Sequence, residues 1–541
     1  MKVGRGRCAE DLHHFALVMG GMVSDWRAHA ADSELSKLVE QLRPGELDSW
    51  LDAATPRLPE TVRVNPCRSD AEWTRQTLLE MGAKSIGWFT GTGGAYTMPW
   101  EKARCENSEF IENIRSLHIT GRITRQEAAS MMPVQALDVQ PGHRVLDLCA
   151  APGSKTTQIA EALRGDGLVV ANEPNPGRAN NLVSNVQRSG HLNVVVVRED
   201  GRNFPRVAEP GFDRILVDAP CTGTGTTRKN TDVWAKWKPH HGEQMSRLQI
   251  GILSRAAMLL RPQGRMVYST CSIDPAENEK VVEIILERFP WLSLADVNRS
   301  DIFPGLITRS GLTENTKQCI RVWNDENDGS GFFIAVFSQN EEDEVSARAT
   351  RAHPRDIGKE PVPITPKPLG KMDLRLGDLD DQMLFNEWGM NEEGLTLWMR
   401  GQYAHISTDA IREWLWDAPR LTGKHHLYPG GHWQPLRVLQ AGQPVWKIRK
   451  GRNRLISTGI HGLARRVTNY CMEIDRDLVI RLLNGEEPGR STLAESFQSQ
   501  RDGGILLVHE NEFLPAWLAG KMSLMMTDAE KHILSLKLGL V

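Results

Sequence analysis

Strand and helix patterns alternate along residues 144–288, and this alternation constrains the fold more than any other feature of the sequence. Short runs of aliphatic and β-branched residues predict strands at 144–147, 168–172, 193–198, 213–217 and 264–269. The stretches between them predict helices at 155–164, 177–189, 245–260 and 275–288. Such alternation predicts an α/β domain with a doubly wound, mostly parallel sheet, which a last strand at 331–337 completes.

Length and composition limit the class of protein. The chain has 541 residues, too many for one ordinary core, so we expect two or three domains. A hydrophobic content of 40% and a net charge of −3 indicate a soluble protein that can carry a local basic groove but no general coat of nucleic acid. There is no membrane-length apolar run and no signal-peptide core, so we expect a cytoplasmic location, or a nuclear one in a eukaryote.

Changes in composition predict the order of domains. A charged helical segment at 1–60 and a small α+β module at 61–120 precede the α/β domain, which spans 121–340. An acidic run from Glu341 to Glu344 opens a proline-containing linker at 341–370. Residues 371–541 are expected to form a second folded region with helical and strand-like pieces.

Acidic side chains end four successive strands of the predicted sheet. Asp147, Glu173, Asp200 and Asp218 occupy these ends, and ligands bind at this edge of an open parallel sheet. A turn of small residues and a helix start follow the first strand at 149–155, where backbone amides can approach a ligand closely. The turn matches neither a Walker A loop nor the GxGxxG pattern. One such acid alone would be an ordinary turn residue, but four predict a nucleotide-sized pocket.

Two of the eight cysteines, Cys221 and Cys271, follow predicted strands and would lie in the same crevice. No CxxC pair occurs, so neither a zinc ribbon nor a thioredoxin motif is supported. Metal binding is poorly supported, because only His240 and His241 are near these loops in sequence. The spacing leaves catalysis and simple packing open. Cys149 is interpreted as a packing residue of the pocket wall, and the remaining cysteines as buried free thiols.

Cations and tryptophans alternate along residues 226–238, directly after the Cys221 loop. This composition suits phosphates and stacked bases, although it is also common on ordinary protein surfaces. Its position beside the strand-end thiol favours a contact with substrate.

These features resemble the NOP2/Sun (RsmB-type) family of RNA cytosine-C5 methyltransferases, and in particular its tRNA branch, called Trm4 or NSUN2. The resemblance covers about residues 45–340. It rests on the motifs Arg63-Val64-Asn65-Pro66, Arg125-Gln126-Glu127-Ala128, Cys149 to Lys155, Asp218-Ala219-Pro220-Cys221 and Ser269-Thr270-Cys271-Ser272. Glu173 departs from the branch, which commonly has Asp there, but a longer carboxylate can still reach a ribose.

The resemblance implies an S-adenosylmethionine-dependent tRNA (cytosine-C5) methyltransferase with the class I methyltransferase fold. Cys271 would attack C6 of cytosine, and Cys221 would assist loss of the C5 proton and release of the enzyme. Asp218 would hydrogen-bond the edge of the cytosine. The residues expected to contact the cofactor are Cys149, Ala150, Ala151, Pro152, Gly153, Ser154, Lys155, Glu173, Arg178, Asp200 and Asp218.

The resemblance also implies RNA, and specifically tRNA, as the partner, with a PUA-like domain in the C-terminal region. The basic and aromatic residues expected to contact RNA are Arg63, Arg125, Arg228, Lys229, Trp234, Lys447, Arg449, Lys450 and Arg452. We expect a monomer that binds neither a metal nor a membrane. Three alternatives remain: the same chemistry on rRNA, a non-catalytic RNA-binding homologue, and an amino-group methyltransferase that needs no thiol nucleophile.

Overall fold

The computed structural model describes residues 30–207, 211–297, 299–339, 360–422, 425–449 and 452–540. The predicted acidic run, residues 345–359 of the predicted linker, Cys8 and Lys450 lie outside the described residues.

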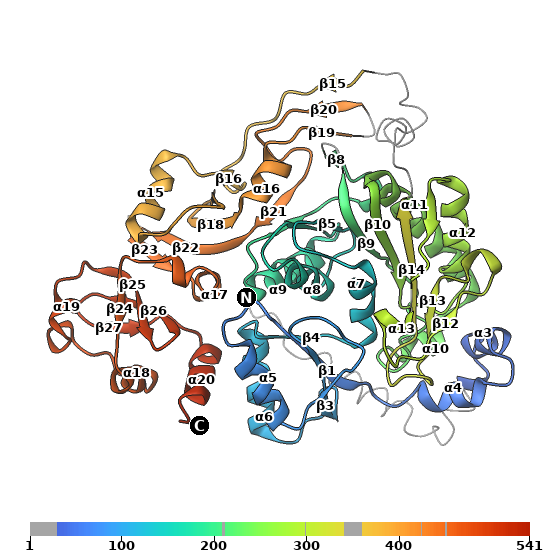
Figure 1. Ribbon diagram of the computed structural model, residues 1–541, viewed down its shortest axis with the longest axis horizontal. Helices are drawn as coiled ribbons and strands as arrows, with labels where there is room; N and C mark the ends of the chain where they lie inside the picture. The colour runs from blue at the N-terminus through green and yellow to red at the C-terminus, as the bar shows by residue number, and fades with distance from the viewer. Residues whose placement is uncertain are drawn as a thin grey trace.

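One mixed sheet forms the centre of the molecule (Figure 1), with the strand order β12-β13-β14-β10-β9-β5-β6-β7-β21. The middle strands are parallel: β5 (Arg144–Asp147), β6 (Leu168–Asn172), β7 (Val194–Val197), β9 (Phe212–Asp218) and β10 (Leu260–Thr270). The chain runs outward from β5 to β6 and β7 on one side and to β9 and β10 on the other. This arrangement confirms the predicted doubly wound sheet.

Helices cover both faces of this sheet. The helices α7 (Met132–Leu137), α8 (Ser154–Leu163) and α9 (Pro176–Ser189) pack on one face, and α11 (Pro239–Leu259) and α12 (Glu279–Arg288) on the other. Successive side chains of a strand point to opposite faces of the sheet. Val145 therefore packs in the core beneath α7, α8 and α9, and its neighbour Leu146 packs in the core beneath α11 and α12. Helix α11 begins earlier than predicted, at Pro239, since proline is well suited to a first helical turn.

Antiparallel strands and short helices complete this part of the chain. Strand β14 (Phe332–Gln339) pairs with β10, and β13 (Ile320–Val322) pairs with β14. The remaining elements are β8 (Arg206–Val207), α10 (Asp232–Lys236), β11 (Leu292–Leu294), α13 (Arg299–Ile302) and β12 (Arg309–Ser310).

The N-terminal part, blue in Figure 1, lies below the central sheet. Helices α3 (Glu34–Leu42) and α4 (Leu47–Ala53) pack near Trp237 and Trp323 of the α/β domain. A separate sheet follows with the order β2-β3-β1-β4. Its elements are β1 (Pro59–Val64), α5 (Ala71–Glu80), β2 (Lys84–Ser85), β3 (Ala95–Glu101), α6 (Ser108–Ile119) and β4 (Ile123–Arg125).

The C-terminal part is joined to the central sheet. Strand β21 (Val438–Ala441) pairs with β7 and extends the sheet at that edge. Several buried tryptophans from this part belong to the core on the α11 side of the sheet, and the Trp414 ring lies 4.6 Å from that of Phe212. The α/β domain therefore shares one hydrophobic core with residues that follow the linker.

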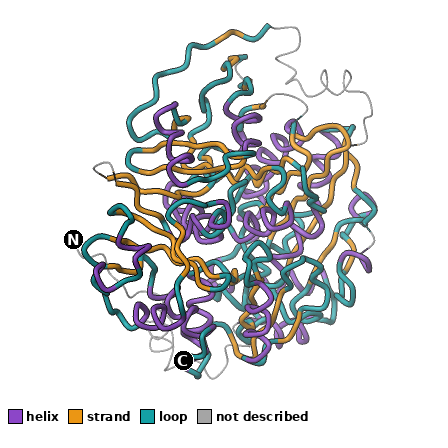
Figure 2. Tube along the Cα trace, turned by 60° about the vertical axis from the view of Figure 1, so that its left-hand side comes forward, coloured by secondary structure: helices purple, strands orange, loops and turns teal. Residues whose placement is uncertain are grey.

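Two further sheets make the C-terminal part β-rich, as predicted. The first contains β16 (Arg375–Leu376), β17 (Leu395–Arg400), β18 (Tyr403–Thr408), β22 (Gln443–Arg449) and β23 (Arg452–Leu455), and the second contains β24 (Cys471–Glu473), β25 (Gly503–His509), β26 (Glu512–Leu518) and β27 (Met522–Leu524). A small sheet joins β8 to β15 (Val362–Pro363), β19 (Arg420–Leu421) and β20 (His426–Tyr428). The helices are α15 (Leu379–Trp388), α16 (Asp409–Ile411), α17 (Ser457–Ile460), α18 (Arg476–Leu483), α19 (Glu495–Gln498) and α20 (Asp528–Lys537). Figure 2 shows helices beside strands through the whole molecule.

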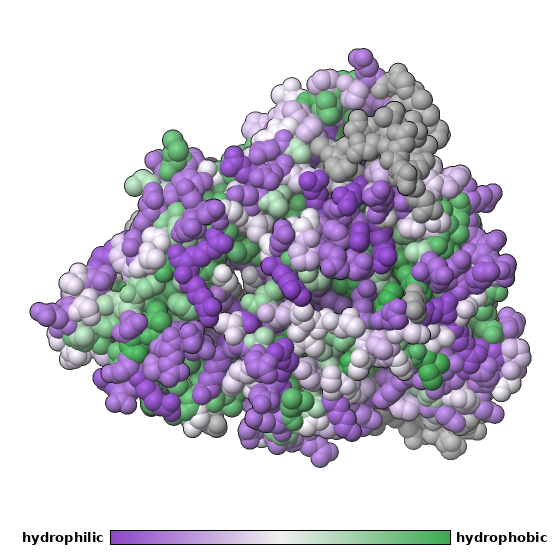
Figure 3. Space-filling view, viewed as in Figure 1, coloured by the Kyte–Doolittle hydropathy of each residue, from purple (hydrophilic) through white to green (hydrophobic). Residues whose placement is uncertain are grey.

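The molecular face in Figure 3 is largely hydrophilic, with hydrophobic residues in small separate groups. None of the helices in the described ranges is both long and apolar enough to cross a membrane. The same ranges contain no cluster of three or more metal-binding side chains.

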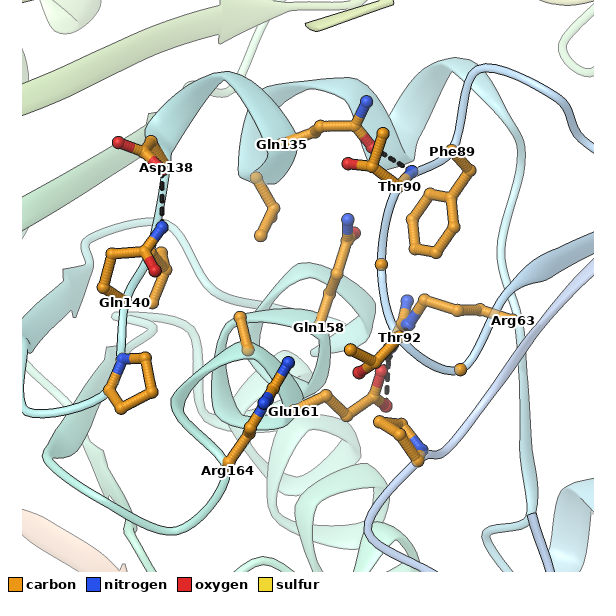
Figure 4. Close-up of a pocket in the computed structure, with 17 residues that line it drawn as sticks. Arg63, Phe89, Thr90, Thr92, Gln135, Asp138, Gln140, Gln158, Glu161 and Arg164 are labelled. Atoms are coloured by element: carbon orange, nitrogen blue, oxygen red, sulfur yellow. Dashed lines mark hydrogen bonds and ion pairs between the residues drawn. The ribbon is translucent and has the colours of Figure 1, made fainter. Parts of the chain in front are cut away.

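A buried ion pair joins the N-terminal sheet to the α/β domain (Figure 4). The Arg63 side chain on β1 is 1% exposed, and its Nε lies 2.7 Å from Oε2 of Glu161 on α8. The guanidinium also donates to Oγ1 of Thr157 at 3.0 Å and to the side chain of Gln126. The expected RNA contact of Arg63 is therefore wrong, because its donors are used inside the protein. Burial raises the pKa of Glu161, and the charge of Arg63 opposes that rise.

We predict that Glu161→Gln lowers the free energy of unfolding by about 3–5 kcal/mol, because it leaves the buried charge of Arg63 without a counter-ion. Urea denaturation measures this change. The control is Glu112→Gln, which breaks an ion pair whose partners are 66% and 43% exposed and should cost less than about 1 kcal/mol. The double change Arg63→Met with Glu161→Leu should recover much of the loss. Equal denaturation midpoints for Glu161→Gln and the unmodified protein would contradict this account.

Candidate functional site

A cavity of about 770 Å³ opens at the carboxyl ends of the parallel strands, where the sequence predicts a ligand pocket. Most of the predicted cofactor and catalytic residues line it together with two of the predicted RNA contacts. These lining residues are Arg125, Cys149, Ala151, Pro152, Ser154, Lys155, Glu173, Arg178, Asp200, Asp218, Cys221, Lys229 and Cys271. Residues far apart in sequence thus share one site.

The turn after β5 forms one wall of the cavity. Gly153 has a φ of +113°, a left-handed conformation, and a Cβ at this position would lie 2.9 Å from Cδ1 of Leu182. Glycine is therefore required where the turn passes into α8. The turn is held from outside, because Nη2 of Arg178 donates to the carbonyl of Ala151 at 2.8 Å and Nδ2 of Asn185 donates to that of Pro152.

The predicted strand-end acids differ in their surroundings. Glu173 is 2% exposed and accepts a hydrogen bond from the backbone N–H of Asn175 at 2.9 Å. The Asp200 carboxylate is paired with Arg202 at 2.6 Å, and this hydrogen bond lowers the pKa of Asp200. Burial raises the pKa of Asp147 to about 7. Its carboxyl group lies inside the turn and accepts a hydrogen bond from Oγ1 of Thr156.

Lys155 and Asp218 form an ion pair on the cavity wall. Nζ of Lys155 lies 2.7 Å from Oδ2 of Asp218 and also donates to Oγ of Ser130 at 2.7 Å. The other carboxylate oxygen of Asp218 accepts from Oγ of Ser269 at 2.8 Å. Asp218 is thus held in one orientation by a cation and a hydroxyl, with its carboxylate at the cavity wall where it can meet a polar ligand group.

The two strand-end thiols lie together in this cavity. Sγ of Cys221 is 3.1 Å from Sγ of Cys271, and both are free thiols. The hydrogen bond to Cys271, followed by burial, raises the pKa of Cys221 well above the usual value of a thiol. Either sulfur can be the donor of the hydrogen bond between them. Burial likewise raises the pKa of Cys149, which agrees with a packing role in the wall.

A single buried carboxylate ties the two cysteine loops together. Glu277 is fully buried, and its Oε2 accepts from the backbone N–H of Thr222 at 3.0 Å. Its Oε1 accepts from the hydroxyl of Thr222 and from Oγ of Ser272 at 2.7 Å. Gln249 on α11 donates both to Glu277 and to the carbonyl of Pro220, each at 2.9 Å. Since Thr222 and Ser272 each follow a cysteine, Glu277 joins the two loops next to the thiols.

Sequence reasoning missed Glu277, Gln249, Ser130 and Ser269. The one available signal for Glu277 was an acid near the start of the helix predicted at 275–288, which by itself is ordinary. Their role depends on loops that meet only in the folded chain.

The predicted RNA contacts fall into two groups. Arg125, which pairs with Glu60, and the exposed Lys229 line the cavity and can meet a substrate. The expectation is wrong for Arg228, whose side chain is 6% exposed and donates to the carbonyls of Pro56 and Arg57.

Trp234 is half-buried against the N-terminal helices, with its ring 5.3 Å from that of Trp50. In the C-terminal part, Lys447, Arg449 and Arg452 lie on the β22–β23 hairpin, where Arg449 pairs in register with Arg452. Arg449 and Arg452 are exposed. RNA binding by Trp234 and by these hairpin residues remains a prediction.

Comparisons with known proteins agree on one family. A family model described as "16S rRNA methyltransferase RsmB/F" matches residues 134–338. The "Multisite-specific tRNA:(cytosine-C(5))-methyltransferase" of Saccharomyces cerevisiae is 39% identical over 293 residues, which are 45% of this chain and 43% of that protein. The "Ribosomal RNA small subunit methyltransferase F" of Shigella boydii is 33% identical over 385 residues, which are 68% of this chain and 73% of that protein.

Among solved structures, a methyltransferase homolog protein from Pyrococcus horikoshii is 29% identical, with a TM-score of 0.45, over 56% of this chain and 92% of that one. The chain spans less than half the length of its yeast relative.

We predict that Glu277→Gln loosens both cysteine loops. The amide offers one acceptor where the carboxylate offers two, so buried donors lose partners and the free energy of unfolding should fall by about 1–3 kcal/mol. Both thiols should then react faster with iodoacetamide, which peptide mass spectrometry measures for each cysteine. The control is Glu287→Gln, an exposed residue of α12, the helix that begins two residues after Glu277. Unchanged alkylation rates would show that Glu277 does not hold the loops.

Proposed function

Since this chain belongs to the RsmB/F (NOP2/Sun) family of RNA methyltransferases, we propose that it methylates C5 of cytosine in tRNA. The observation that carries the proposal is the pair of thiols 3.1 Å apart in the strand-end cavity. Methylation of an exocyclic amino group needs no thiol nucleophile, whereas the carbon C5 must first be activated by addition at C6. The presence of both thiols also disfavours a non-catalytic RNA-binding protein.

S-adenosylmethionine is the cofactor of this family, and the cavity fits it. The volume lies in the range of small-molecule sites. The turn at Gly153 brings backbone close to the ligand space, the start of α8 offers amides, and the buried Glu173 can accept hydrogen bonds from a ribose. When bound, this cofactor supplies an electrophilic methyl group. Lys155, Arg178 and Asp200 line the same space and complete a polar pocket.

We assign the role of nucleophile to Cys271. Cys271 stands in the Thr-Cys motif that carries the nucleophile in the family, and it lies in the strand-end cavity where its sulfur can attack C6 of cytosine. Attack forms a bond from sulfur to C6 and makes C5 an electron-rich enamine carbon, which takes the methyl group. A base then takes the C5 proton, the C–H electron pair re-forms the C5–C6 double bond, and the bond from C6 to Cys271 breaks with its electrons returning to the sulfur as a thiolate.

Asp218 and Cys221 assist these steps from fixed positions. Lys155 and Ser269 hold the Asp218 carboxylate, which can accept a hydrogen bond from the cytosine edge. Cys221 lies next to the attacking sulfur, so it is placed to assist proton loss and release. A paired cytosine would first have to leave its stack, and the exposed Lys229 at the cavity can bind the displaced strand.

Two observations support tRNA over rRNA. The yeast relative is named for tRNA, and the basic and tryptophan-containing segment at 226–238 resembles the tRNA branch. The rRNA alternative has its own support, because the Shigella relative is named for rRNA and matches a larger share of this chain. We also propose that the C-terminal sheets form a PUA-like RNA-binding domain, and that the protein is monomeric and cytoplasmic.

The deciding experiment supplies the protein with labelled S-adenosylmethionine and either tRNA or small-subunit rRNA, and then identifies the methylated nucleoside. We expect 5-methylcytidine in tRNA, and none with Cys271→Ala. If 5-methylcytidine is found in rRNA alone, the substrate is rRNA and the tRNA proposal is wrong. N4-methylcytidine, or full activity of Cys271→Ala, would overturn the chemistry.

We predict that the β22–β23 hairpin binds the tRNA backbone. Changing Lys447, Arg449 and Arg452 to Gln should weaken tRNA binding and flatten the slope of log affinity against log salt by roughly one unit per lost phosphate contact. Fluorescence anisotropy at several salt concentrations measures both. A matched control changes Lys37, Lys317 and Arg481 to Gln, whose side chains are 60%, 58% and 49% exposed elsewhere. Equal slopes for the two triple variants would exclude the hairpin.

A further inference from the structure

A second large cavity, of about 880 Å³, lies away from the strand-end site. Loops 164–167 and 189–193 line it, and these loops precede β6 and β7. The cavity is therefore at the amino edge of the parallel strands, whereas the proposed catalytic site is at the carboxyl edge. Its other walls come from the N-terminal sheet and from both C-terminal sheets. Figure 3 shows a hollow between the C-terminal lobe and the middle of the molecule.

Arginine is the dominant charged residue of this cavity. The arginines that line it are Arg68, Arg122, Arg164, Arg465 and Arg466. The lining carboxylates are Asp70, Asp166, Asp409 and Glu512. Two of these acids are already neutralised, because Asp70 pairs with Arg122 and Lys537, and Glu512 pairs with Lys537.

Several buried donors in the walls have no hydrogen-bond partner among the described residues. They are Nε of Arg68, Nη1 of Arg122 and Nδ2 of Asn193. Arg122 and Asn193 are 6% and 1% exposed. A buried donor left unpaired is costly, and native proteins normally satisfy such groups with protein, water or a ligand. This concentration of unsatisfied donors around one cavity indicates a missing acceptor.

Arg68 has no carboxylate at ion-pair distance within the described part of the chain, and its guanidinium donates to the carbonyl of Thr120. Desolvation and the charge of Arg122 lower the pKa of Arg68 to about 10, although the more distant Asp70, Glu530 and Glu512 oppose that change. Water could satisfy the neutral donors, whereas an anion at ion-pair distance would also balance the charge of Arg68. The two lining histidines, His191 and His461, have lowered pKa values through burial and stay neutral.

We propose that this cavity is a binding site for phosphate groups. Guanidinium groups match the geometry of phosphate oxygens, and a phosphate would supply acceptors for the unpaired donors together with a negative charge close to Arg68. The bound group would contact the N-terminal sheet, the α/β domain and the C-terminal sheets together, and would so hold the three parts in place. The phosphate comes either from an RNA backbone or from a free polyphosphate ion. The site does not depend on the proposed methyl transfer.

Inorganic pyrophosphate is the probe, titrated into the full chain by calorimetry at constant ionic strength. We expect binding to the unmodified protein with a rise in melting temperature, because only the folded chain forms the site. Arg68→Gln should weaken binding by about tenfold, as expected for loss of a charge-assisted hydrogen bond. The exposed pair Arg465→Gln with Arg466→Gln provides a second test if Arg68→Gln fails to fold. The control is Arg104→Gln with Arg115→Gln, whose side chains are 60% and 66% exposed elsewhere.

A competition experiment with a short oligouridylate distinguishes the two sources of phosphate, an RNA backbone and a free polyphosphate ion. If the oligonucleotide displaces pyrophosphate, and if the same variants weaken binding of the oligonucleotide, the site binds an RNA backbone. If pyrophosphate binds and is not displaced, the site takes free phosphate ions. No binding of pyrophosphate, or binding unaffected by both cavity variants, would overturn the proposal. Binding of S-adenosylhomocysteine at the strand-end cavity confirms that each variant is folded.

Discussion

The buried carboxylate of Glu277 is the contact on which the geometry of the proposed active site depends. The two cysteine loops follow the paired strands β9 and β10 and also contact each other directly, since the backbone N–H of Gly225 donates to the carbonyl of Cys271 at 2.9 Å. Glu277 adds a shared partner by accepting hydrogen bonds from Thr222 and Ser272. A charged acceptor buried without water is favourable only when every oxygen is paired, so the loops can approach it in few ways. The two sulfurs lie 3.1 Å apart next to this contact.

The site is held within a sheet that the whole chain helps to build. The N-terminal sheet is attached to α8 through the buried pair Arg63–Glu161, and α8 starts at the turn that forms a wall of the cavity. On the other side, β21 extends the sheet beside β7, and Trp414 packs on Phe212 at the start of β9. Flanking parts that carry basic residues are therefore rigidly placed relative to the thiols, which suits a large nucleic-acid substrate.

The sequence predicted local features well and long-range ones poorly. Periodicity and turn residues located β5 and β6 to the residue and placed α9 within one residue of its start, since these signals are short-range. The prediction that residues at the ends of neighbouring strands lie together is confirmed for Cys221, Cys271 and Asp218, which line one cavity. Burial of Arg63 and Arg228 could not be foreseen, because an arginine in an extended segment looks the same whether it faces solvent or a carboxylate. The shared core with the C-terminal tryptophans likewise depends on pairing across the linker, which leaves no periodic trace.

The most direct test of the account uses Cys221→Ala protein with S-adenosylmethionine and tRNA, analysed on a denaturing gel. If Cys271 forms the bond to C6 and Cys221 assists release, a covalent protein–tRNA band should accumulate and should disappear when Cys271→Ala is added. A band that persists without Cys271 would contradict the assignment of the nucleophile. Absence of any band, in a variant that still methylates tRNA at the normal rate, would contradict the role of Cys221.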